Sequence, residues 1–344
     1  MKLIQSLRNI TILSFFSYGT VVSSLSVQSA TSVDPTIQLQ TFLDSKDGAA
    51  RFCEIGQTKY GRGLVATKKL EPGETAIRVP MASVLVEPDN LEEESILEDD
   101  CWAGRLANRL IRMTKQNSIY AQTLPLPPSS PVRAEDWPEW ILDEFQNEEF
   151  TREISTVQDW RYHQWKAYSG SHEDRQSFLD ALDLVCSRTI RCGKDMMLVP
   201  LVDMANHASR QEGGGYYKRN KEEETVSLIV GERGILEGEE VTLDYGDRTN
   251  EDWLLYYGFL PYRNDAEIVK LPSSKRIVSW LDVQTKDLTL KQECLEFLQK
   301  SKTTLEEDLN ESRRDGHSTS DDYRYKMALQ YRISRKILLS AVAA

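Results

Sequence analysis

The chain has 344 residues, enough for one large domain or two modest ones at roughly 150 residues per domain. Apolar residues make up 40% and charged residues 28%, which supports a packed core and excludes a chain that is disordered throughout. The formal net charge of −12 argues against binding to a nucleic-acid backbone as the main function, so no nucleic-acid partner is expected.

Residues 1–32 have the composition of a targeting segment. Lys2 and Arg8 lie near the start, residues 10–16 are mostly apolar, and residues 23–30 are mostly small, as at a cleavage site. Both a secretory signal and an organelle transit peptide fit this pattern. The 5 scattered cysteines lack a CxxC pair and favour reduced thiols, so we expect an organelle, with a plastid favoured over the secretory pathway. The mature chain is expected to be a monomer without a membrane span.

Residues 50–87 are typical of strands and turns. Residues 64–67 and 75–79 are rich in β-forming side chains, and Pro72 and Gly73 between them suit a type II turn. We therefore predict a hairpin formed by these two runs.

Residues 88–186 are charged and predicted to be helical, as an insertion within a β-domain. Asp136 can cap a helix with Pro138 in its first turn. The predicted apolar faces of two helices are formed by Trp137, Trp140, Ile141 and Phe145, and by Phe178, Leu179, Leu182, Val185 and Cys186.

Residues 187–262 return to a strand-like pattern, with a clear strand at 225–230. Residues 213–215 are three glycines and residues 219–224 are charged, which together predict a mobile loop. Residues 263–344 are predicted to be helical, with Met327, Tyr331 and Leu338 on one face.

Two short motifs could hold a ligand. Gly61 and Gly63 flank Arg62 and would let the backbone pass close to a small molecule, although such pairs also occur in plain turns. Asn206 and His207 can offer donors and acceptors to an adenine edge or a carboxylate, or can be structural. The 4 histidines have no partner at zinc-ligand spacing, so no metal is expected.

Two tyrosines follow these motifs. Tyr245 precedes Gly246 and could orient a nucleophile, and Tyr257 could line an apolar channel. The alternative is that both tyrosines belong to the core.

The order of these motifs resembles that of the SET-domain protein methyltransferases of the split type. This class includes the plant Rubisco large-subunit lysine methyltransferase and the actin-histidine methyltransferase. The matching segments are 61–67, 200–207, 244–246, Asn250 and 257–259. The resemblance covers roughly residues 40–262 and implies an α+β fold. In that fold a β-rich SET domain (40–87 and 187–262) is split by the helical insertion 88–186. A shortened helical lobe, 263–344, follows and resembles the family's substrate-binding lobe.

The resemblance implies a protein-lysine N-methyltransferase that uses S-adenosylmethionine and acts on a non-histone protein. Tyr245 matches the catalytic tyrosine of the family. Asp203 and Tyr257 match positions around the substrate side chain. The implied cofactor-binding residues are Tyr60, Gly61, Arg62, Arg188, Asn206, His207, Gly258 and Phe259.

Three alternatives stay open. The chain could methylate histidine rather than lysine, or could be a non-catalytic scaffold on a degenerate SET fold. A cysteine hydrolase could use Cys186 or Cys192 with His207 and Asp203, although no turn typical of a nucleophile is evident.

Overall fold

The computed structural model describes most of the chain in two compact units. The described residues are 34–87, 101–124, 133–168, 175–313 and 320–344. The sheet unit comprises the described residues of 34–130 and 161–246, and the helical unit comprises those of 131–160 and 247–344. These boundaries differ from the predicted segments, because residues 131–160 of the predicted insertion group with the C-terminal residues. The predicted leader lies outside the described residues.

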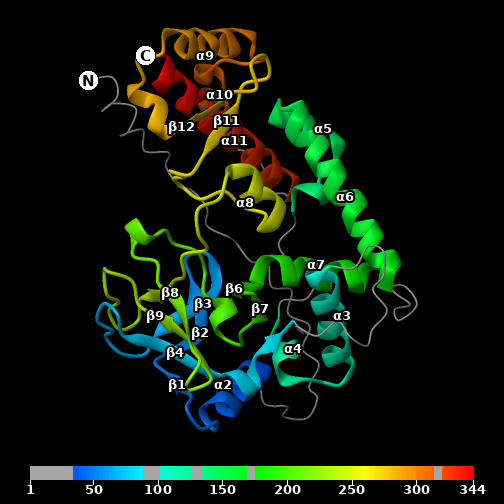
Figure 1. The fold of residues 1–344 in the computed structure, drawn as a ribbon, viewed down its shortest axis with the longest axis vertical. Coiled ribbons are helices and arrows are strands. Elements are labelled where there is room, and N and C mark those ends of the chain that lie inside the picture. Colours follow the sequence, from blue (N-terminus) through cyan, green and yellow to red (C-terminus); the bar gives the residue numbers. More distant parts are fainter. Residues whose placement is uncertain (1–33, 88–100, 125–132, 169–174, 314–319) are drawn as a thin grey trace. The chain divides into compact units, whose positions relative to one another are not determined.

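The strands of the sheet unit form three small antiparallel sheets within the described residues (Figure 1). The first has the order β1 (Ala50–Arg51), β4 (Thr75–Pro80), β9 (Thr225–Ile229), β8 (Tyr216–Asn220). The second has the order β10 (Glu240–Val241), β3 (Gly61–Ala66), β2 (Cys53–Thr58). The third has the order β5 (Leu85–Val86), β7 (Asp195–Leu198), β6 (Ile190–Cys192). All residues of β9 are buried, which explains why this strand was the clearest in the sequence.

The predicted turn at Pro72 and Gly73 is present, but the predicted hairpin is wrong. Gly73 has φ +81°, and the Glu74 N–H donates to the Glu71 carbonyl at 3.0 Å, as in a type II turn. However, β3 pairs with β2 and β10, whereas β4 pairs with β1 and β9. The intervening segment forms a bridge between Leu70 and Ile235 instead, so it directs the two strands into different sheets.

Residues 213–224 are more ordered than the predicted mobile loop. The charged residues form the end of the β8–β9 hairpin, in which Asn220 pairs with Thr225. A Cβ atom on Gly214 would lie 1.9 Å from the Ala208 carbonyl oxygen, and one on Gly215 would lie 2.3 Å from that of Ile229. The glycines therefore allow a close crossing of backbones, which a sequence pattern alone does not distinguish from flexibility.

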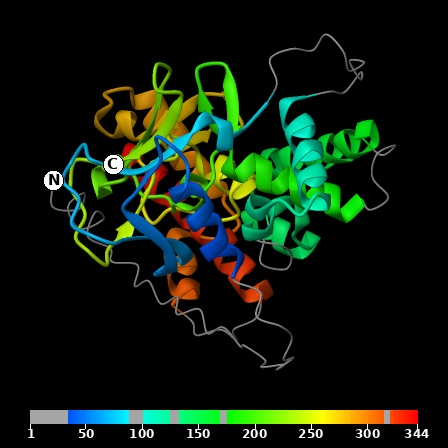
Figure 2. The ribbon, with the colours of Figure 1, turned by 90° about the horizontal axis from the view of Figure 1, so that it is seen from below.

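Four complete α-helices accompany the sheets among the described residues of this unit, which also contains the end of α6 (Glu148–Tyr168). They are α2 (Pro35–Asp44), α3 (Trp102–Lys115), α4 (Ile119–Thr123) and α7 (Arg175–Arg188). Asp34 caps α2 through a 2.8 Å bond from the Thr36 N–H. Helices α3 and α7 pack against each other (Figure 2). The predicted apolar face of α7 is confirmed for Phe178, Leu179, Leu182 and Val185, which are buried, whereas Cys186 is only half-buried.

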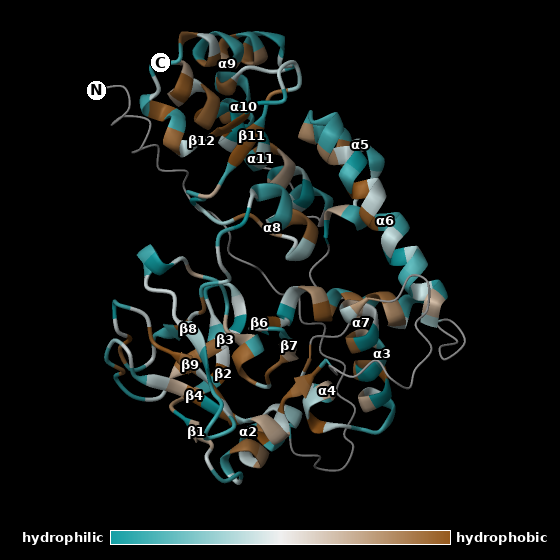
Figure 3. Ribbon diagram, in the orientation of Figure 1, coloured by the Kyte–Doolittle hydropathy of each residue, from teal (hydrophilic) through white to brown (hydrophobic). Residues whose placement is uncertain are grey.

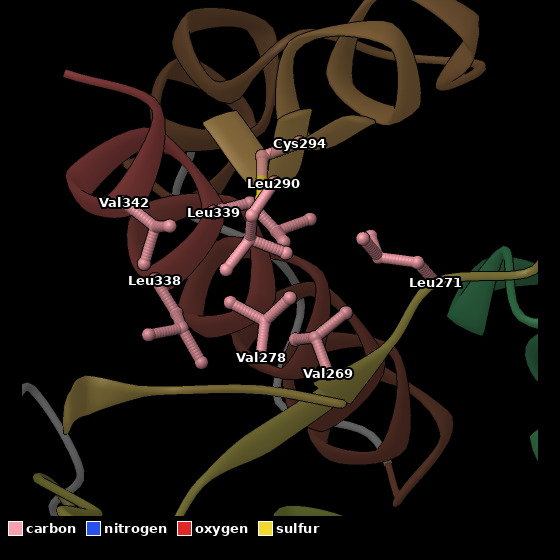
Figure 4. Packing of buried hydrophobic residues seen from close by; sticks show 8 residues of the cluster. All are labelled: Val269, Leu271, Val278, Leu290, Cys294, Leu338, Leu339 and Val342. Atoms are coloured by element: carbon pink, nitrogen blue, oxygen red, sulfur yellow. The ribbon is translucent and has the colours of Figure 1, made fainter. Parts of the chain in front are cut away.

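The helical unit packs its helices around one β-hairpin. Its elements are α5 (Glu139–Leu142), the first half of α6 (Glu148–Tyr168), α8 (Asn250–Tyr256), β11 (Ile268–Lys270), β12 (Ile277–Ser279), α9 (Leu288–Lys300), α10 (Leu305–Ser312) and α11 (Ser320–Ala343). Strands β11 and β12 are hydrophobic in Figure 3, and their Val269 and Val278 are fully buried. They join a core with residues of α9 and α11, including Leu290, Leu338 and Leu339 (Figure 4).

The region around Asp136 differs from the prediction. Asp136 ends a short 3₁₀ helix, and Pro138 is the N-cap residue of α5, without a side-chain cap. Ile141 and Phe145 are buried as predicted, whereas Trp140 is 53% exposed. The helix lasts a single turn because the chain continues as a 3₁₀ helix at Asp143, so helical spacing does not hold across this segment.

Helix α11 carries the predicted apolar face of Met327, Tyr331 and Leu338, and all three side chains are buried. Within the described ranges, no helix combines the length and apolar character needed to cross a membrane. No disulfide joins the 5 cysteines, all of which lie in the described part of the chain.

Candidate active site

The first motif forms the turn between β2 and β3. Thr58 pairs with Gly61, and Lys59 and Tyr60 lie between them, so this is a two-residue hairpin turn. The Thr58 hydroxyl accepts from the Tyr60 N–H at 3.2 Å and donates to the Gly61 carbonyl at 3.0 Å. Gly61 has φ +99°, a conformation that strains any other residue. Tyr60 is 60% exposed at the tip of the turn.

The second motif lies directly against this hairpin. The Asn206 side-chain amide donates to Glu240 Oε1 at 2.7 Å and to Thr58 Oγ1 at 3.3 Å. A Cβ atom on Gly63 would lie 2.7 Å from Asn206 Nδ2, so the glycine makes this approach possible. The Asn206 amide thus links the 206–207 segment to β2 and β10.

The third motif packs beside the second. The Tyr245 hydroxyl donates to the Ala205 carbonyl at 2.7 Å, and the Tyr245 backbone N–H donates to His207 Nδ1 at 3.3 Å. The rings of His207 and Tyr245 are 5.2 Å apart between centroids. Tyr245 is half-buried. The structure therefore brings residues 61–63, 205–207 and 245 together within the sheet unit.

Arg188 and Asp203 form a buried polar cluster behind these motifs. Arg188, the last residue of α7, donates from an Nη to the Asp203 carbonyl at 2.6 Å. Asp203 is only 6% exposed, and its carboxylate accepts from the Tyr120 hydroxyl at 2.8 Å. Burial raises the pKa of Asp203, and the charge of Arg188 and the Tyr120 hydrogen bond oppose this rise.

Two guanidinium groups meet at this cluster. Partial burial lowers the pKa of Arg62, and the nearby charge of Arg188 lowers it further, whereas Asp203 acts in the opposite direction. Arg188 Nε and Asp203 Oδ1 are both buried without a hydrogen-bond partner among the described residues. Two close cations with one shared carboxylate favour a ligand that carries an anionic group.

Tyr257, Gly258 and Phe259 belong to the helical unit. They follow α8, where Gly258 has φ +72° and its N–H donates to the Trp253 carbonyl at 2.9 Å, which ends the helix. The Tyr257 ring packs 4.9 Å from that of Trp253, and the Arg248 guanidinium lies 5.2 Å from its centroid. These contacts explain the local conformation of the segment without assigning it a ligand.

The arrangement disfavours a cysteine hydrolase. His207 Nδ1 already accepts the Tyr245 N–H, and the Asp203 carboxylate bonds to Tyr120 rather than serving as the partner of an imidazole. A metal centre has no candidate either, because no group of three or more His, Cys, Asp or Glu side chains in the described ranges could hold an ion.

Sequence reasoning missed three residues of this site: Thr58, Tyr120 and Glu240. Thr58 stands three residues before Gly61, and a hydroxyl at that place is a usual sign of a side-chain-stabilised turn. Glu240 and Tyr120 carry no such signal, because their partners lie 34 and 83 residues away in the sequence.

Comparison with known proteins places this geometry in a known fold. No protein-family model matches the chain. SET domain-containing protein 8 of Schizosaccharomyces pombe is 36% identical over 69 residues, which are 20% of this chain and only 15% of that protein. The SET domain of LSMT bound to lysine and AdoHcy superposes with a TM-score of 0.66 at 15% identity, over 90% of both chains. Rubisco LSMT bound to AdoMet gives the same TM-score and identity over 91% of both chains. The predicted α+β class and the resemblance to SET-domain proteins are confirmed at the level of the fold, and the chain has the SET-domain fold of LSMT.

Proposed function

We propose that the protein transfers a methyl group from S-adenosylmethionine to a lysine side chain of another protein. The observation that carries the proposal is the Tyr245 hydroxyl, which donates to the Ala205 carbonyl directly beside Asn206 and His207. The SET fold supports it, since one similar solved structure holds AdoHcy together with lysine and another holds AdoMet. The 69-residue relative is matched over a small part of its length, so the activity rests on the fold and the site.

The residues at the site fit the cofactor. S-adenosylmethionine carries a carboxylate and an ammonium group at its amino-acid end, and when bound it supplies a methyl group on a positively charged sulfur. Arg62 and Arg188 would hold the carboxylate. The buried Arg188 Nε is a donor without an acceptor, and the buried Asp203 Oδ1 is an acceptor without a donor, among the described residues. The backbone of the hairpin at Gly61 would approach the cofactor without interference from a Cβ atom.

Tyr245 would orient the amine that is methylated. Because its hydroxyl proton is donated to Ala205, its oxygen lone pairs remain able to accept an N–H from an incoming amine. The lysine must lose its proton first, and its reference pKa is about 10.4. The positive charge on the sulfur of the bound cofactor would lower that pKa. Alignment of the amine with the methyl group at ~3–3.5 Å can supply roughly 7–11 kcal/mol of the barrier.

The proposed target is a lysine of a non-histone protein, which rests on the resemblance to the split SET class. A methyl label found on histidine would correct the residue specificity, and a chain that binds no cofactor would be a scaffold. The proposed location is an organelle, with a plastid favoured, and it rests on the composition of residues 1–32. Import of a fluorescent fusion of the full chain into isolated organelles tests it.

The test of the function compares three full-length proteins. The wild type, Tyr245→Phe and Tyr216→Phe are incubated with a cell extract and methyl-labelled cofactor, and cofactor binding is measured by calorimetry. Tyr245→Phe should lose at least ~100-fold in transfer rate, the scale for removing one group that stabilises a transition state, and should keep its cofactor affinity. Tyr216 is an exposed tyrosine of β8, so its variant controls for loss of a hydroxyl. Unchanged transfer by Tyr245→Phe would refute the assigned role.

A further inference from the structure

We infer that Tyr120 is a positioning residue for the cofactor: it holds the Asp203 carboxylate away from Arg188, so that Arg188 stays available to the carboxylate of the ligand. The inference rests on the proposed function. It also gives Asp203 a different place from the substrate contact that the resemblance implies, because this carboxylate is buried behind the site.

Tyr120 lies on α4, outside every sequence motif of the site. It is 5% exposed, and its hydroxyl makes a 2.8 Å bond to Asp203 Oδ2. Burial, followed by the charge of Asp203, raises the pKa of Tyr120 well above its ordinary value, so the phenol stays protonated and remains a donor. The contact is therefore a fixed hydrogen bond to a buried charged group, which is among the stronger kinds.

The segment that Tyr120 anchors leads directly into the second motif. Asp203 lies in the short 3₁₀ helix η5 (Val202–Met204), which is followed at once by Ala205, the acceptor of the Tyr245 hydroxyl. The residue before this helix, Leu201, has φ +69°, an unfavourable conformation for a residue with a branched side chain. Such a conformation persists only where surrounding contacts impose it, and the Tyr120 bond is one of these contacts.

Arg188 is the neighbour that Asp203 would otherwise capture. Its Nη already donates to the Asp203 backbone carbonyl, and its Nε has no acceptor among the described residues. Asp203 Oδ1 likewise has no donor there. Without the Tyr120 hydroxyl, neither oxygen of the Asp203 carboxylate would have a donor, and the carboxylate would turn toward the Arg188 guanidinium. An ion pair between Asp203 and Arg188 would then compete with the ligand carboxylate for the same group.

The test uses two ligands that differ in the group that Arg188 would hold. AdoHcy carries the amino-acid carboxylate, and 5′-methylthioadenosine does not. Calorimetry on full-length Tyr120→Phe should show AdoHcy binding weakened by roughly tenfold to a hundredfold, the range for losing a hydrogen bond to a charged group, with methylthioadenosine binding unchanged. Thr123→Val removes another buried hydroxyl of α4, one that bonds to the Tyr120 carbonyl, and should change neither affinity.

A double variant separates positioning from a loss of structure. If Tyr120 acts through the Asp203 charge, then Tyr120→Phe combined with Asp203→Asn should bind AdoHcy as tightly as Asp203→Asn alone, because the competing carboxylate is gone. This comparison also holds if the single variant Tyr120→Phe does not fold, since the double variant leaves no buried carboxylate without a donor. A double variant clearly weaker than Asp203→Asn, or equal weakening of both ligands in Tyr120→Phe, overturns the inference. Wild type that binds neither ligand would instead refute the proposed function.

Discussion

Replacing Glu267 by glutamine should stabilise the helical unit above neutral pH. Glu267 is 2% exposed, and its carboxylate accepts from the Asn250 N–H, at the start of α8, at 2.7 Å. Burial raises the pKa of Glu267 from 4.5 to about 7; the Asn250 bond and Arg335 oppose this rise, and Glu251 adds to it. Glutamine has nearly the shape of the protonated carboxyl, and its oxygen can keep the bond to Asn250.

The sign and size of the effect follow from the two pKa values of Glu267. The folded chain binds the proton between pH 4.5 and about 7, where the unfolded chain does not. The stability from this group is therefore complete below pH 4.5 and is lost as the pH rises through about 7. The difference between a pKa of 4.5 and one of about 7, at about 1.4 kcal/mol for each pH unit, gives about 3.5 kcal/mol in total. Roughly 1.4 kcal/mol of this falls between pH 6 and pH 8.5, a range that avoids the isoelectric point near 5.0.

The assay is hydrogen exchange of the α8 amides, read by mass spectrometry and corrected for the intrinsic exchange rate. A local probe is preferable because a chain of two units need not unfold in one step. From pH 6 to pH 8.5, protection should fall about tenfold in the wild type and stay constant in Glu267→Gln. Glu296→Gln, an exposed site on α9, is the control and should behave as the wild type does. Equal pH dependence in Glu267→Gln and wild type would show that Glu267 does not titrate in this range.

Three further substitutions test the packing of the sheet unit. Gly63→Ala should displace the Asn206 side chain and lower the free energy of unfolding by ~1–3 kcal/mol, because the new Cβ would lie 2.7 Å from Asn206 Nδ2. Thermal melting and cofactor calorimetry measure the effect, and an unchanged melting temperature and affinity would contradict the contact. Asp183→Ala removes the carboxylate 2.9 Å from the buried Arg161 and should cost ~3–5 kcal/mol in urea unfolding, whereas a loss below ~1 kcal/mol would mean a solvated pair. Gly214→Ala places a Cβ atom 1.9 Å from a backbone carbonyl oxygen and should abolish soluble expression, so a soluble, normally melting variant would refute the close crossing.

The sequence predicts local structure correctly where that structure depends on residues close together in the chain. The Pro72–Gly73 turn, the apolar face of α7 and the strand at β9 each follow from side chains within a few positions of one another. Pairing between distant strands was not predictable in this way. The turn at Gly73 predicts a hairpin, but β3 pairs with β2 and β10 and β4 pairs with β1 and β9, and two of these partners, β9 and β10, lie far along the chain.

The run of three glycines at 213–215 has two opposite interpretations in the sequence. Gly213, Gly214 and Gly215 were interpreted as a mobile loop, because a run of glycines has the same composition whether it serves flexibility or close packing. In the structure, Gly215 forms a bridge with Leu243, and so does His207. The segments that contain Gly215 and His207 therefore both pair with Leu243, and only glycine fits between the backbones at 214 and 215.

The sequence likewise reveals some residues of the site, whereas the positions of others depend on the fold. Arg62, Asn206, His207 and Tyr245 stand in short motifs whose residue types are already suited to a ligand. The network that fixes them is scattered, because a buried carboxylate such as Asp203 needs a donor from whichever element packs against it. Here that donor is Tyr120, from a helix in the predicted insertion. If Tyr120 positions Asp203 as we infer, a change in that insertion alters cofactor affinity while every motif of the site stays the same, and a motif search would classify such a chain as unaltered.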